Sequence, residues 1–553
     1  MKFHPSNFFQ LTLATIVLFL SFSCNKDSDL LAEYVVENPQ SFLTNDEVIT
    51  LSNNPIIIKP LSNDKFDKPE EVVITAVTPP KMGTAELQGD NTVVYTPNTD
   101  ESGTDEFDYT TTVTNPDSSV STATGSISVT VTPTSKATTD PNAVNFSKYG
   151  VVGDGVTDDT AALQAAFNAG TNLLSDAGKT YLISKTLSLN KNLVQTIDFN
   201  GSTLTRNRTV DWMISIDKRA YANSLTTIKN LDVDGNHKGG KVIDIKSRVN
   251  FQNIEIFDVI SDNANGIRIL IYDDPGMYGQ SVFDNVDIHN LESVNSNGRS
   301  GDNPGMVHGF LVSAQETPSK TTQIVYKNSE LYELWGEDAG GITLNSPGRD
   351  TSNSPLSFWI ENVNISDAQR RTVKCFIGNT TWVNCTFTSA AANNPKLVPA
   401  DAGGLAPAGL FVISSGSSAK GATNNIVCGS TFQGHPSDPF DSWYTQVIVL
   451  GQHGPAGAEF SNCTFTGDHP SSSGYNGFTA YVVAADGGTI KNLSFANCTF
   501  GTSNTMRVVA PVTDGLKMST DNTYADGSAK VFSGLSLKHS EPSIPYSPCP
   551  TID

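Results

Sequence analysis

The stretches VFDNVDIHNL (Val282–Leu291), IVYKNSELYEL (Ile324–Leu334) and FWIENVNISDA (Phe358–Ala368) decide the fold, because they can be laid one under another. Each is a short strand-and-turn unit with alternating apolar residues and a turn rich in Asn or Gly. Five more units follow the same pattern: FQNIEIFDV (251–259), TWVNCTFTSA (381–390), NIVCGSTFQG (425–434), AEFSNCTFTG (458–467) and LSFANCTFGT (493–502). The pattern predicts a chain of internal repeats.

A second apolar strand follows each of the early units at a regular distance. These second strands read GIRILIY (266–272), GFLVSA (309–314), GITLNS (341–346) and TVKCF (372–376). The spacing is 32 residues from Gly309 to Gly341 and 31 residues from Gly341 to Thr372. Such regularity indicates stacked coils in which each repeat packs on its neighbours.

A helical segment precedes the repeats. GVTDDTAALQAAF (155–167) predicts a helix that begins near Asp158 and Asp159, has one apolar face and ends at Gly170. This segment and the repeats resemble the pectin-lyase-like right-handed parallel β-helix superfamily, in its pectate-lyase-like and rhamnogalacturonase-like branch. The resemblance implies an all-β fold with a capping helix on the first coil. It also implies a polysaccharide as the substrate class.

The residues before the repeats have a different character. The alternating runs EVVITAV (71–77), NTVVYTP (91–97) and SISVTVTP (126–133) are typical of short strands in a β-sandwich. Together with GTDEFDY (103–109), they resemble the cadherin-like, immunoglobulin-like modules of bacterial surface proteins, which usually act as spacers. We therefore expect a β-sandwich over residues 24–134, a linker over 135–142 and the β-helix over 143–553.

The N-terminus is typical of an export signal. An apolar run of twelve residues, LTLATIVLFLSF (11–22), is too short to span a bilayer and is followed by Ser23 and Cys24. Residues 1–23 resemble a bacterial lipoprotein signal peptide. That resemblance implies lipidation of Cys24 and anchoring at the bacterial outer membrane. The alternative is an ordinary secretion signal in which Cys24 has no special role.

Charge and cysteine placement limit the functional classes. A net charge of −22 argues against a nucleic-acid partner and against membrane contact other than through the lipid anchor. Three of the seven cysteines repeat in NCTF, at Cys385, Cys463 and Cys498, and Cys428 lies just before a related STF. This placement predicts small buried side chains rather than a disulfide framework. We expect a monomer.

One basic cluster stands out in this acidic chain, QRRTVKCF (Gln369–Phe376). Alternation along the strand predicts Val373 and Cys375 inside the coil and Thr372, Lys374 and Phe376 outside. The same rule places Arg268, Thr343 and Asn345 outside on neighbouring coils. We expect Arg268 and Lys374 to share one exposed sheet face. Loop residues should gather around it: Asp302, His308, Glu337, Asp338, Arg370 and Arg371.

A resemblance to polygalacturonases is incomplete. That family combines three Asp with a GHG turn and a following RIK, whereas Arg371-Thr-Val-Lys374 is one residue longer and no GHG precedes it. β-Elimination at a uronic acid is the alternative chemistry. It needs a cation beside the carboxylate and a base near the C5 proton. We predict Lys374 as the base, its pKa lowered by Arg370, Arg371 and Arg268, with His308 as an alternative base or as the acid.

The sequence therefore predicts a lyase acting on an acidic polysaccharide such as ulvan, alginate or pectin, by chain cleavage or by dehydration at a chain end. Predicted catalytic residues are Lys374, Arg371, His308, Glu337 and Asp338, and predicted substrate-binding residues are Arg370, Arg268 and Asp302. Glu337 and Asp338 could instead form a solvated turn or bind Ca²⁺. The alternatives are a glycoside hydrolase that uses Glu337, Asp338 and Asp302, and a non-catalytic glycan-binding surface protein. The cations could also pair with acids of adjacent coils as surface ladders.

Overall fold

The computed structural model describes much of the chain from residue 43 onward. The described ranges are 43–51, 55–64, 72–89, 91–98, 101, 103–114, 120–132, 140–293, 306–369, 371–388, 410–416, 420–433, 446–466, 479–484, 487–500, 506–508, 516–518, 522–524 and 549–552. The predicted signal peptide and Cys24 lie outside them. The chain divides into two compact units, Met1–Thr138 and Thr139–Asp553. Within the described ranges, no helix combines the length and apolar character needed to cross a membrane.

The N-terminal unit is an Ig-like β-sandwich of two sheets. One sheet has the order β1 (Asp46–Leu51), β7 (Val120–Thr132), β6 (Gly103–Thr114) and β3 (Val72–Val77), and the other has β2 (Ile56–Ile58), β5 (Val93–Pro97) and β4 (Gly83–Leu87). A short 3-10 helix, η1 (Pro60–Asn63), follows β2. Alternate residues of the strands, including Tyr95, Phe107 and Ile127, meet in one apolar core. The expected sandwich is confirmed.

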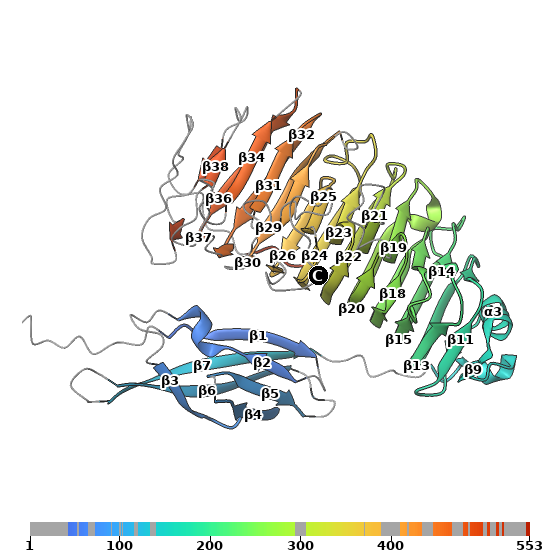
Figure 1. Ribbon diagram of the computed structural model, residues 1–553, viewed down its shortest axis with the longest axis horizontal. Helices are drawn as coiled ribbons and strands as arrows, with labels where there is room; N and C mark the ends of the chain where they lie inside the picture. Colours follow the sequence, from blue (N-terminus) through green and yellow to red (C-terminus); the bar gives the residue numbers. More distant parts are fainter. Residues whose placement is uncertain are drawn as a thin grey trace, which may run out of the picture. The chain divides into compact units, whose positions relative to one another are not determined.

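The C-terminal unit is a parallel β-helix whose strands stack coil upon coil (Figure 1). In the described residues, 22 strands form one long sheet: β8 (Val144–Asn145), β9 (Asp154–Asp158), β10 (Leu173–Leu174), β11 (Thr180–Ile183), β13 (Val194–Arg206), β15 (Leu225–Asp234), β17 (Val249–Phe257), β18 (Val259–Ile260), β20 (Gly279–Glu292), β22 (Thr322–Trp335), β24 (Leu356–Ile365), β26 (Thr380–Val383), β27 (Thr386–Thr388), β29 (Ala422–Cys428), β30 (Thr431–Gln433), β32 (Pro455–Ser461), β33 (Thr464–Thr466), β35 (Thr489–Ile490), β36 (Leu493–Ala496), β37 (Thr499–Phe500), β39 (Leu516–Met518) and β40 (Thr523–Tyr524). All pairings within it are parallel, as the repeats predicted.

A second sheet of the β-helix contains 11 described strands. In order they are β12 (Leu187–Leu189), β14 (Val210–Ile216), β16 (Gly240–Ile245), β19 (Ala264–Ile271), β21 (Met306–Ala314), β23 (Glu337–Asn345), β25 (Arg371–Phe376), β28 (Phe411–Ser414), β31 (Gln446–Gly451), β34 (Thr479–Ala484) and β38 (Met506–Val508). We call it the short sheet and the 22-stranded one the long sheet. The short sheet contains the second strand of each repeat, and it positions most of the described candidate residues. Right-handed coiling is the rule for parallel crossovers.

Asparagines in the left-handed conformation form the corner inside the long sheet. Nine of them, with φ between 49° and 56°, are Asn200, Asn230, Asn253, Asn285, Asn328, Asn362, Asn384, Asn462 and Asn497. Asn tolerates this conformation better than most residues. Their side chains also bond from coil to coil: Nδ2 of Asn285 donates to Oδ1 of Asn253, which donates through its own Nδ2 to Asn230. The repeated Asn of the sequence units is therefore a corner residue that stabilises stacking.

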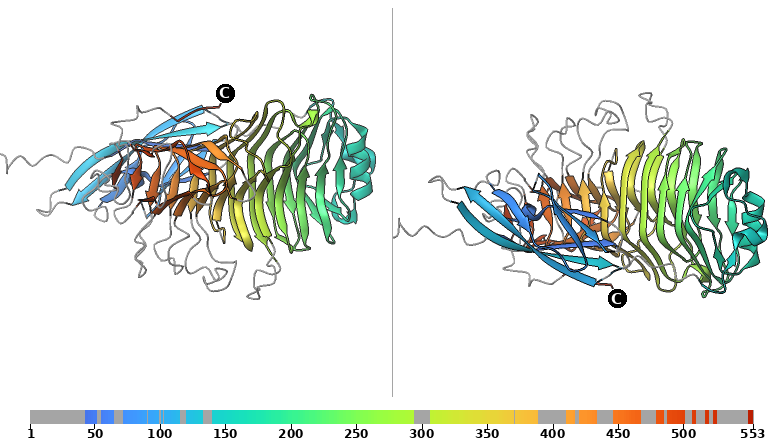
Figure 2. Two further views of the ribbon diagram at one scale, coloured as in Figure 1. Left: turned by 90° about the horizontal axis from the view of Figure 1, so that it is seen from above. Right: turned by 90° about the horizontal axis from the view of Figure 1, so that it is seen from below.

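The predicted helix is α3 (Thr160–Ala169), and it lies at the end of the solenoid beside β9 and β11 (Figures 1 and 2). Asp159 is its N-cap residue and Gly170, with φ 72°, its C-cap, as predicted. Leu163, Ala166 and Phe167 face the core. The Asp159 carboxylate accepts hydrogen bonds from the amides of Val152 and Gly153, which fixes the Gly-rich turn before the helix.

Cysteines occupy two kinds of position. Cys385, Cys463 and Cys498 are buried and form no disulfide, which confirms their predicted role as small core side chains. Cys428 is different, because it forms a disulfide with Cys549 across 121 residues. The expectation that Cys428 only fills the core was wrong. Its partner lies too far along the chain for the repeat pattern to reveal it.

The C-terminal residues pack on the outer face of the long sheet rather than inside the coil. Cys549 and Ile552 contact an apolar cluster of Val325, Trp359 and Val383, which lie on β22, β24 and β26. In Figure 1 the chain end is accordingly beside β24 and β26. The disulfide therefore ties the chain end to coils that precede it by more than a hundred residues.

We predict that the Cys549→Ser substitution lowers the stability of the β-helix by about 2–4 kcal/mol, because the disulfide closes a long loop. Differential scanning calorimetry should show a lower melting temperature for the variant. Reducing agent should lower the wild-type transition to the same temperature and leave the variant unchanged. A further decrease of the variant in reducing agent would show that the effect comes from elsewhere.

Candidate functional site

The short sheet carries a row of outward-facing side chains that are Cα partners on five successive strands. The row consists of Asp244, Arg268, Leu311, Thr343 and Lys374, on β16, β19, β21, β23 and β25. We call it the central row. Arg268 and Lys374 share it, as predicted. They are three strands apart, which corresponds to about 14 Å along the coil axis.

A second row lies three residues earlier on the same strands. Asn265, His308, Gly340 and Arg371 are Cα partners on β19, β21, β23 and β25. Gly340 places no side chain between His308 and Arg371. A Cβ atom at Gly340 would lie 3.3 Å from Oγ1 of Thr343 and 3.8 Å from Cγ of Arg371. The Thr343 hydroxyl and the Arg371 side chain therefore lie next to the position that a side chain at residue 340 would occupy.

A column of glycines sets this arrangement at the start of each strand. A Cβ atom at Gly266 or Gly309 would lie 2.7 or 2.9 Å from the carbonyl oxygen of the next glycine in the column. At Gly341 it would lie 2.9 Å from the carbonyl oxygen of Thr372. Only glycine allows so close an approach. The bend at these glycines separates the row of His308 and Arg371 from the central row.

The predicted alternation holds for most residues of this face. Val373, Cys375, Ile342 and Leu344 are buried in the coil. Lys374 points outward, is partly exposed and lies with Nζ 5.2 Å from the centroid of the Phe376 ring.

Two threonines that were predicted to be exposed are buried instead. Thr372 continues the glycine column, and its hydroxyl donates to the carbonyl of Leu410. Thr343 is covered by its neighbours, and its Oγ1 lies 3.1 Å from Nδ1 of His308. Alternation predicted the side of the strand correctly for Thr343 but not how much of the side chain would be covered.

His308 and Arg371 are strand residues rather than loop residues, in contrast to the prediction. They lie in β21 and β25 and are only 5% and 8% exposed. Strand pairing extends to the beginning of both segments, with a register shift between Met306 and His308 that the sequence pattern did not reveal. The structure thus places His308 on β21 and both Arg371 and Lys374 on β25, two strands of the short sheet with β23 between them.

The structure says less about the remaining predicted site residues. Glu337 and Asp338 begin β23, so they are not part of a turn, and Met306 is the Cα partner of Glu337. Their side chains lie outside the part of the structure that can be described. Arg370 and Asp302 also lie outside the described residues.

Among the described residues, no group of three or more His, Cys, Asp or Glu side chains could hold a metal ion. Calcium binding stays a prediction.

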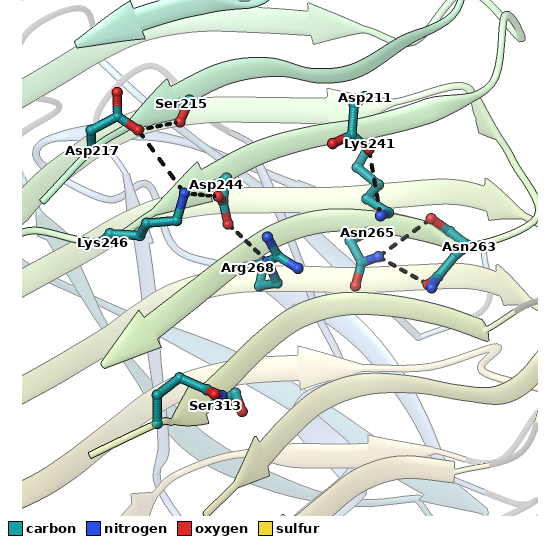
Figure 3. A network of polar contacts seen from close by, with 11 residues as sticks. Asp211, Ser215, Asp217, Lys241, Asp244, Lys246, Asn263, Asn265, Arg268 and Ser313 are labelled. Carbon is teal, nitrogen blue, oxygen red and sulfur yellow. Dashed lines mark hydrogen bonds and ion pairs between the residues drawn. The ribbon is translucent and has the colours of Figure 1, made fainter. Parts of the chain in front are cut away.

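Arg268 belongs to a network of ion pairs at the other end of the central row (Figure 3). Its Nε atom donates to Oδ1 of Asp244 at 2.8 Å, and Nζ of Lys246 lies 2.8 Å from Oδ2 of the same carboxylate. Asp244 is only 2% exposed. The guanidinium of Arg268 also stacks over Trp212, 4.4 Å from the ring centroid. Arg268 therefore pairs with an acid of the adjacent coil, as the alternative of a surface ladder predicted.

The long sheet carries an acidic row that the sequence analysis missed. Asp232, Glu255 and Asp287 are Cα partners on β15, β17 and β20, and the register of β22 places Glu330 next. Each of the four is the second residue after a corner asparagine. Successive carboxylates in such a row are about 4.8 Å apart, where like charges repel. The N-x-[D/E] pattern of NLD, NIE, NVD and NSE was the available signal.

Aromatic residues flank the acidic row. His289 stacks between Phe257 and Tyr332, with ring centroids 5.7 and 4.6 Å away, and its Nε2 lies 2.9 Å from Oε1 of Glu255. The pKa of Asp287 is raised to about 6, chiefly by burial. The hydrogen bond that the Glu330 amide donates to its Oδ1 lowers the pKa, whereas the charges of Glu330 and Glu255 raise it. Burial and Glu255 also raise the pKa of Asp232. One carboxyl of this row therefore titrates near neutral pH.

Comparison with known proteins gives one family match, in the N-terminal unit. Residues 37–132 match the model of a bacterial Ig domain. No curated protein matches the chain. Among solved structures, the A-module of a mannuronan C-5 epimerase from Azotobacter vinelandii is 13% identical, with a TM-score of 0.33, over 69% of this chain and 99% of that one.

Two further solved structures show the same level of similarity. An α-1,3-glucanase catalytic unit from Streptomyces thermodiastaticus is 12% identical, with a TM-score of 0.43, over 79% of this chain and 70% of that one. A surface adhesin of Streptococcus pneumoniae is 12% identical, with a TM-score of 0.37, over 70% of this chain and 98% of that one. Identities and TM-scores this low transfer no activity, substrate or residue role to this chain.

We predict that Asp287→Asn stabilises the protein at pH 8 and has little effect at pH 4. A carboxyl whose pKa is raised from 3.8 to about 6 in the folded state favours folding while protonated, so this contribution is lost as pH rises through 6. The gain at pH 8 should be of the order of 1–3 kcal/mol. Chemical unfolding at both pH values measures it.

Asp284→Asn is the matched control on the same strand. Asp284 lies 3.5 Å from Nζ of Lys327 and accepts a hydrogen bond from Asn328, so loss of its charge should not stabilise the protein at pH 8. Equal stabilisation by both substitutions would mean that lower net charge, rather than the acidic row, is responsible.

Proposed function

We propose that the outer face of the short sheet binds an acidic polysaccharide and cleaves it by β-elimination at a uronic acid. The observation that carries the proposal is the position of His308 on β21 and of Arg371 and Lys374 on β25, on either side of β23, where Gly340 carries no side chain. These are a titratable imidazole, a permanent cation and an amine. They match the three functions that elimination requires.

The proposed reaction assigns one role to each residue. Arg371 pairs with the uronate carboxylate and stabilises the negative charge that develops there. Lys374, in its neutral amine form, takes the proton from C5. His308 donates a proton to the oxygen that leaves C4 as the C4–O bond breaks. The products are an unsaturated uronate with a C4=C5 double bond and the released sugar hydroxyl, or water if the reaction occurs at a chain end.

The contact between Thr343 and His308 supports this assignment. A hydrogen bond at Nδ1 orients the imidazole ring, and Thr343 lies in the central row directly beside Lys374. The three proposed functional groups are thus supported by strands rather than by loops. Rigid support of this kind suits a reaction that depends on the alignment of an acid and a base.

The acidic row favours a second candidate, glycoside hydrolysis on the outer face of the long sheet. Hydrolases of this type use a pair of carboxyl groups, one of which has a raised pKa and acts as the acid. Asp287, with a pKa raised to about 6, lies between Glu255 and Glu330 in adjacent coils. These three carboxyl groups differ from Glu337, Asp338 and Asp302, the residues that the sequence suggested for hydrolysis.

We propose further that the protein is exported and is anchored through Cys24 at the bacterial outer membrane, with the Ig-like sandwich as a spacer. The disulfide between Cys428 and Cys549 supports export, because disulfides persist in oxidising compartments. Ulvan, alginate and pectin are the proposed substrate classes, since all three contain uronic acids.

We predict that Lys374→Ala abolishes elimination and leaves folding intact, because Lys374 is on the surface of the coil. Activity is measured on a panel of uronate polymers and oligomers, with ultraviolet absorbance reporting the new double bond and a reducing-end assay reporting chain cleavage. Loss of a general base should lower the rate by at least about 100-fold. Lys327→Ala is the control, because Lys327 is a partly exposed lysine on the long sheet.

The two assays also separate the candidate functions. Full activity of Lys374→Ala would refute its role as the base. Reducing ends without absorbance, lost in Asp287→Asn but not in Lys374→Ala, would favour hydrolysis at the acidic row. Binding without either signal would indicate a glycan-binding protein.

A further inference from the structure

Arg268 is held by two independent contacts that fix the orientation of its guanidinium. Its Nε atom is bonded to Asp244, and its plane stacks on Trp212. Figure 3 shows the guanidinium of Arg268 beside Asp244, with their hydrogen bond as a dashed line. Arg268 is 27% exposed, whereas Asp244 below it is buried. The fork formed by the two Nη atoms is therefore preorganised and accessible.

The need to neutralise the charge of Asp244 does not by itself explain why an arginine is present at position 268. Lys246 lies 2.8 Å from the second oxygen of this carboxylate and 4.0 Å from Oδ1 of Asp217, so Asp244 has a cationic neighbour besides Arg268, which it shares with Asp217. A buried ion pair contributes little net stability because desolvation opposes it. Asp244 acts instead on Arg268, by fixing the Nε side of the guanidinium and leaving the other side for a ligand.

The chemistry of this position selects an anion. The ring of Trp212 is covered by Arg268 and has Lys241 5.3 Å from its centroid, and Trp212 is only 6% exposed, so it offers no free surface for sugar stacking. A planar guanidinium fork matches the two oxygens of a carboxylate or a sulfate ester. The Arg268 site thus suits the anionic group of a sugar rather than the ring itself.

Position along the coil relates this site to the proposed reaction centre. Arg268 and Lys374 are in the same row, separated by the uncharged residues Leu311 and Thr343. The separation of about 14 Å is too long for two anionic groups of one disaccharide. A chain laid along the coil axis would reach both residues only if it were a trisaccharide or longer.

We propose that Arg268, positioned by Asp244 and Trp212, binds a second anionic group of the polysaccharide three coils away from the reacting uronate. This inference rests on the proposed function for the identity of the reacting end. The affinity would therefore depend on chain length, because a long polyanionic chain binds at two points and a short one at a single point.

The test compares oligogalacturonates of increasing length on the wild type, Arg268→Gln, Arg268→Lys and Asp244→Asn. In the wild type, affinity measured by isothermal titration calorimetry should rise at least about tenfold once the chain spans both sites. Arg268→Gln should lose this gain and keep the affinity for short chains. Arg268→Lys should restore part of it, because a lysine keeps the charge but not the fork.

Asp244→Asn tests the positioning role. It should raise KM for long chains and leave kcat unchanged, since Asp244 contacts Arg268 rather than the substrate. Circular dichroism checks that the variant is folded. If it is not, Arg268→Lys alone decides the outcome. Lys327→Gln removes one positive charge from the other sheet and is the charge-matched control.

The possible results are distinct. A length-dependent gain that is lost in Arg268→Gln and retained in Lys327→Gln supports the inference. An equal loss in both variants, or a gain that survives Arg268→Gln, overturns it. Binding measured on the Lys374→Ala background separates the two proposals. If neither the wild type nor any variant catalyses elimination, but the gain in affinity with chain length still requires Arg268, only the proposed function fails. Sulfated galactan oligomers without uronate form the second arm, and Arg268-dependent binding of these alone would identify a sulfate ester as the ligand.

Discussion

The register between successive coils is the constraint on which the whole β-helix depends. Each coil bonds to the next through parallel backbone hydrogen bonds, and most of the described coils turn at an asparagine in the left-handed conformation. Several of these asparagines bond to the asparagine of the adjacent coil. A shift of one residue would turn every core side chain outward. Because the register is kept, equivalent residues of each repeat fall into columns. The glycine column, the central row and the acidic row are all consequences of that order.

The central row and the acidic row differ in electrostatic character. On the short sheet, Asp244 lies beside Arg268, so adjacent coils neutralise each other. On the long sheet, Asp232, Glu255 and Asp287 follow one another without a cation between them, so adjacent coils repel. A spacing of about 4.8 Å makes each side chain sensitive to the one above and the one below. Net charge alone, −22 for the chain, does not reveal this difference.

Sequence periodicity was sufficient for the fold and for part of the site. The repeats predicted parallel stacked strands, the segment around Leu163 predicted α3, and alternation predicted that Lys374 faces outward. Alternation could not predict that Thr343 and Arg371 would be covered, because coverage depends on neighbouring coils. The side chains of Glu337 and Asp338, and all of Arg370, lie outside what the structure describes, so the proposed site is defined by His308, Arg371 and Lys374.

The acidic row and the disulfide show two different limits of sequence reasoning. The residues of the row are visible in the aligned units, but their proximity becomes apparent only when the coils are placed in register. Cys549 has no repeat of its own, and its partner is 121 residues away. Contacts of this kind depend on the path of the chain after the last coil, which no local pattern encodes.

That return path has a consequence for assembly in the cell. The surface that receives Ile552 is composed of Val325, Trp359 and Val383, which come from three different coils and exist as a surface only after those coils have stacked. The terminal cysteine consequently meets Cys428 last. Formation of the Cys428–Cys549 disulfide should therefore depend on the alignment of these coils, because a misaligned coil would lack part of the surface that receives Ile552 and would not position Cys549 beside Cys428.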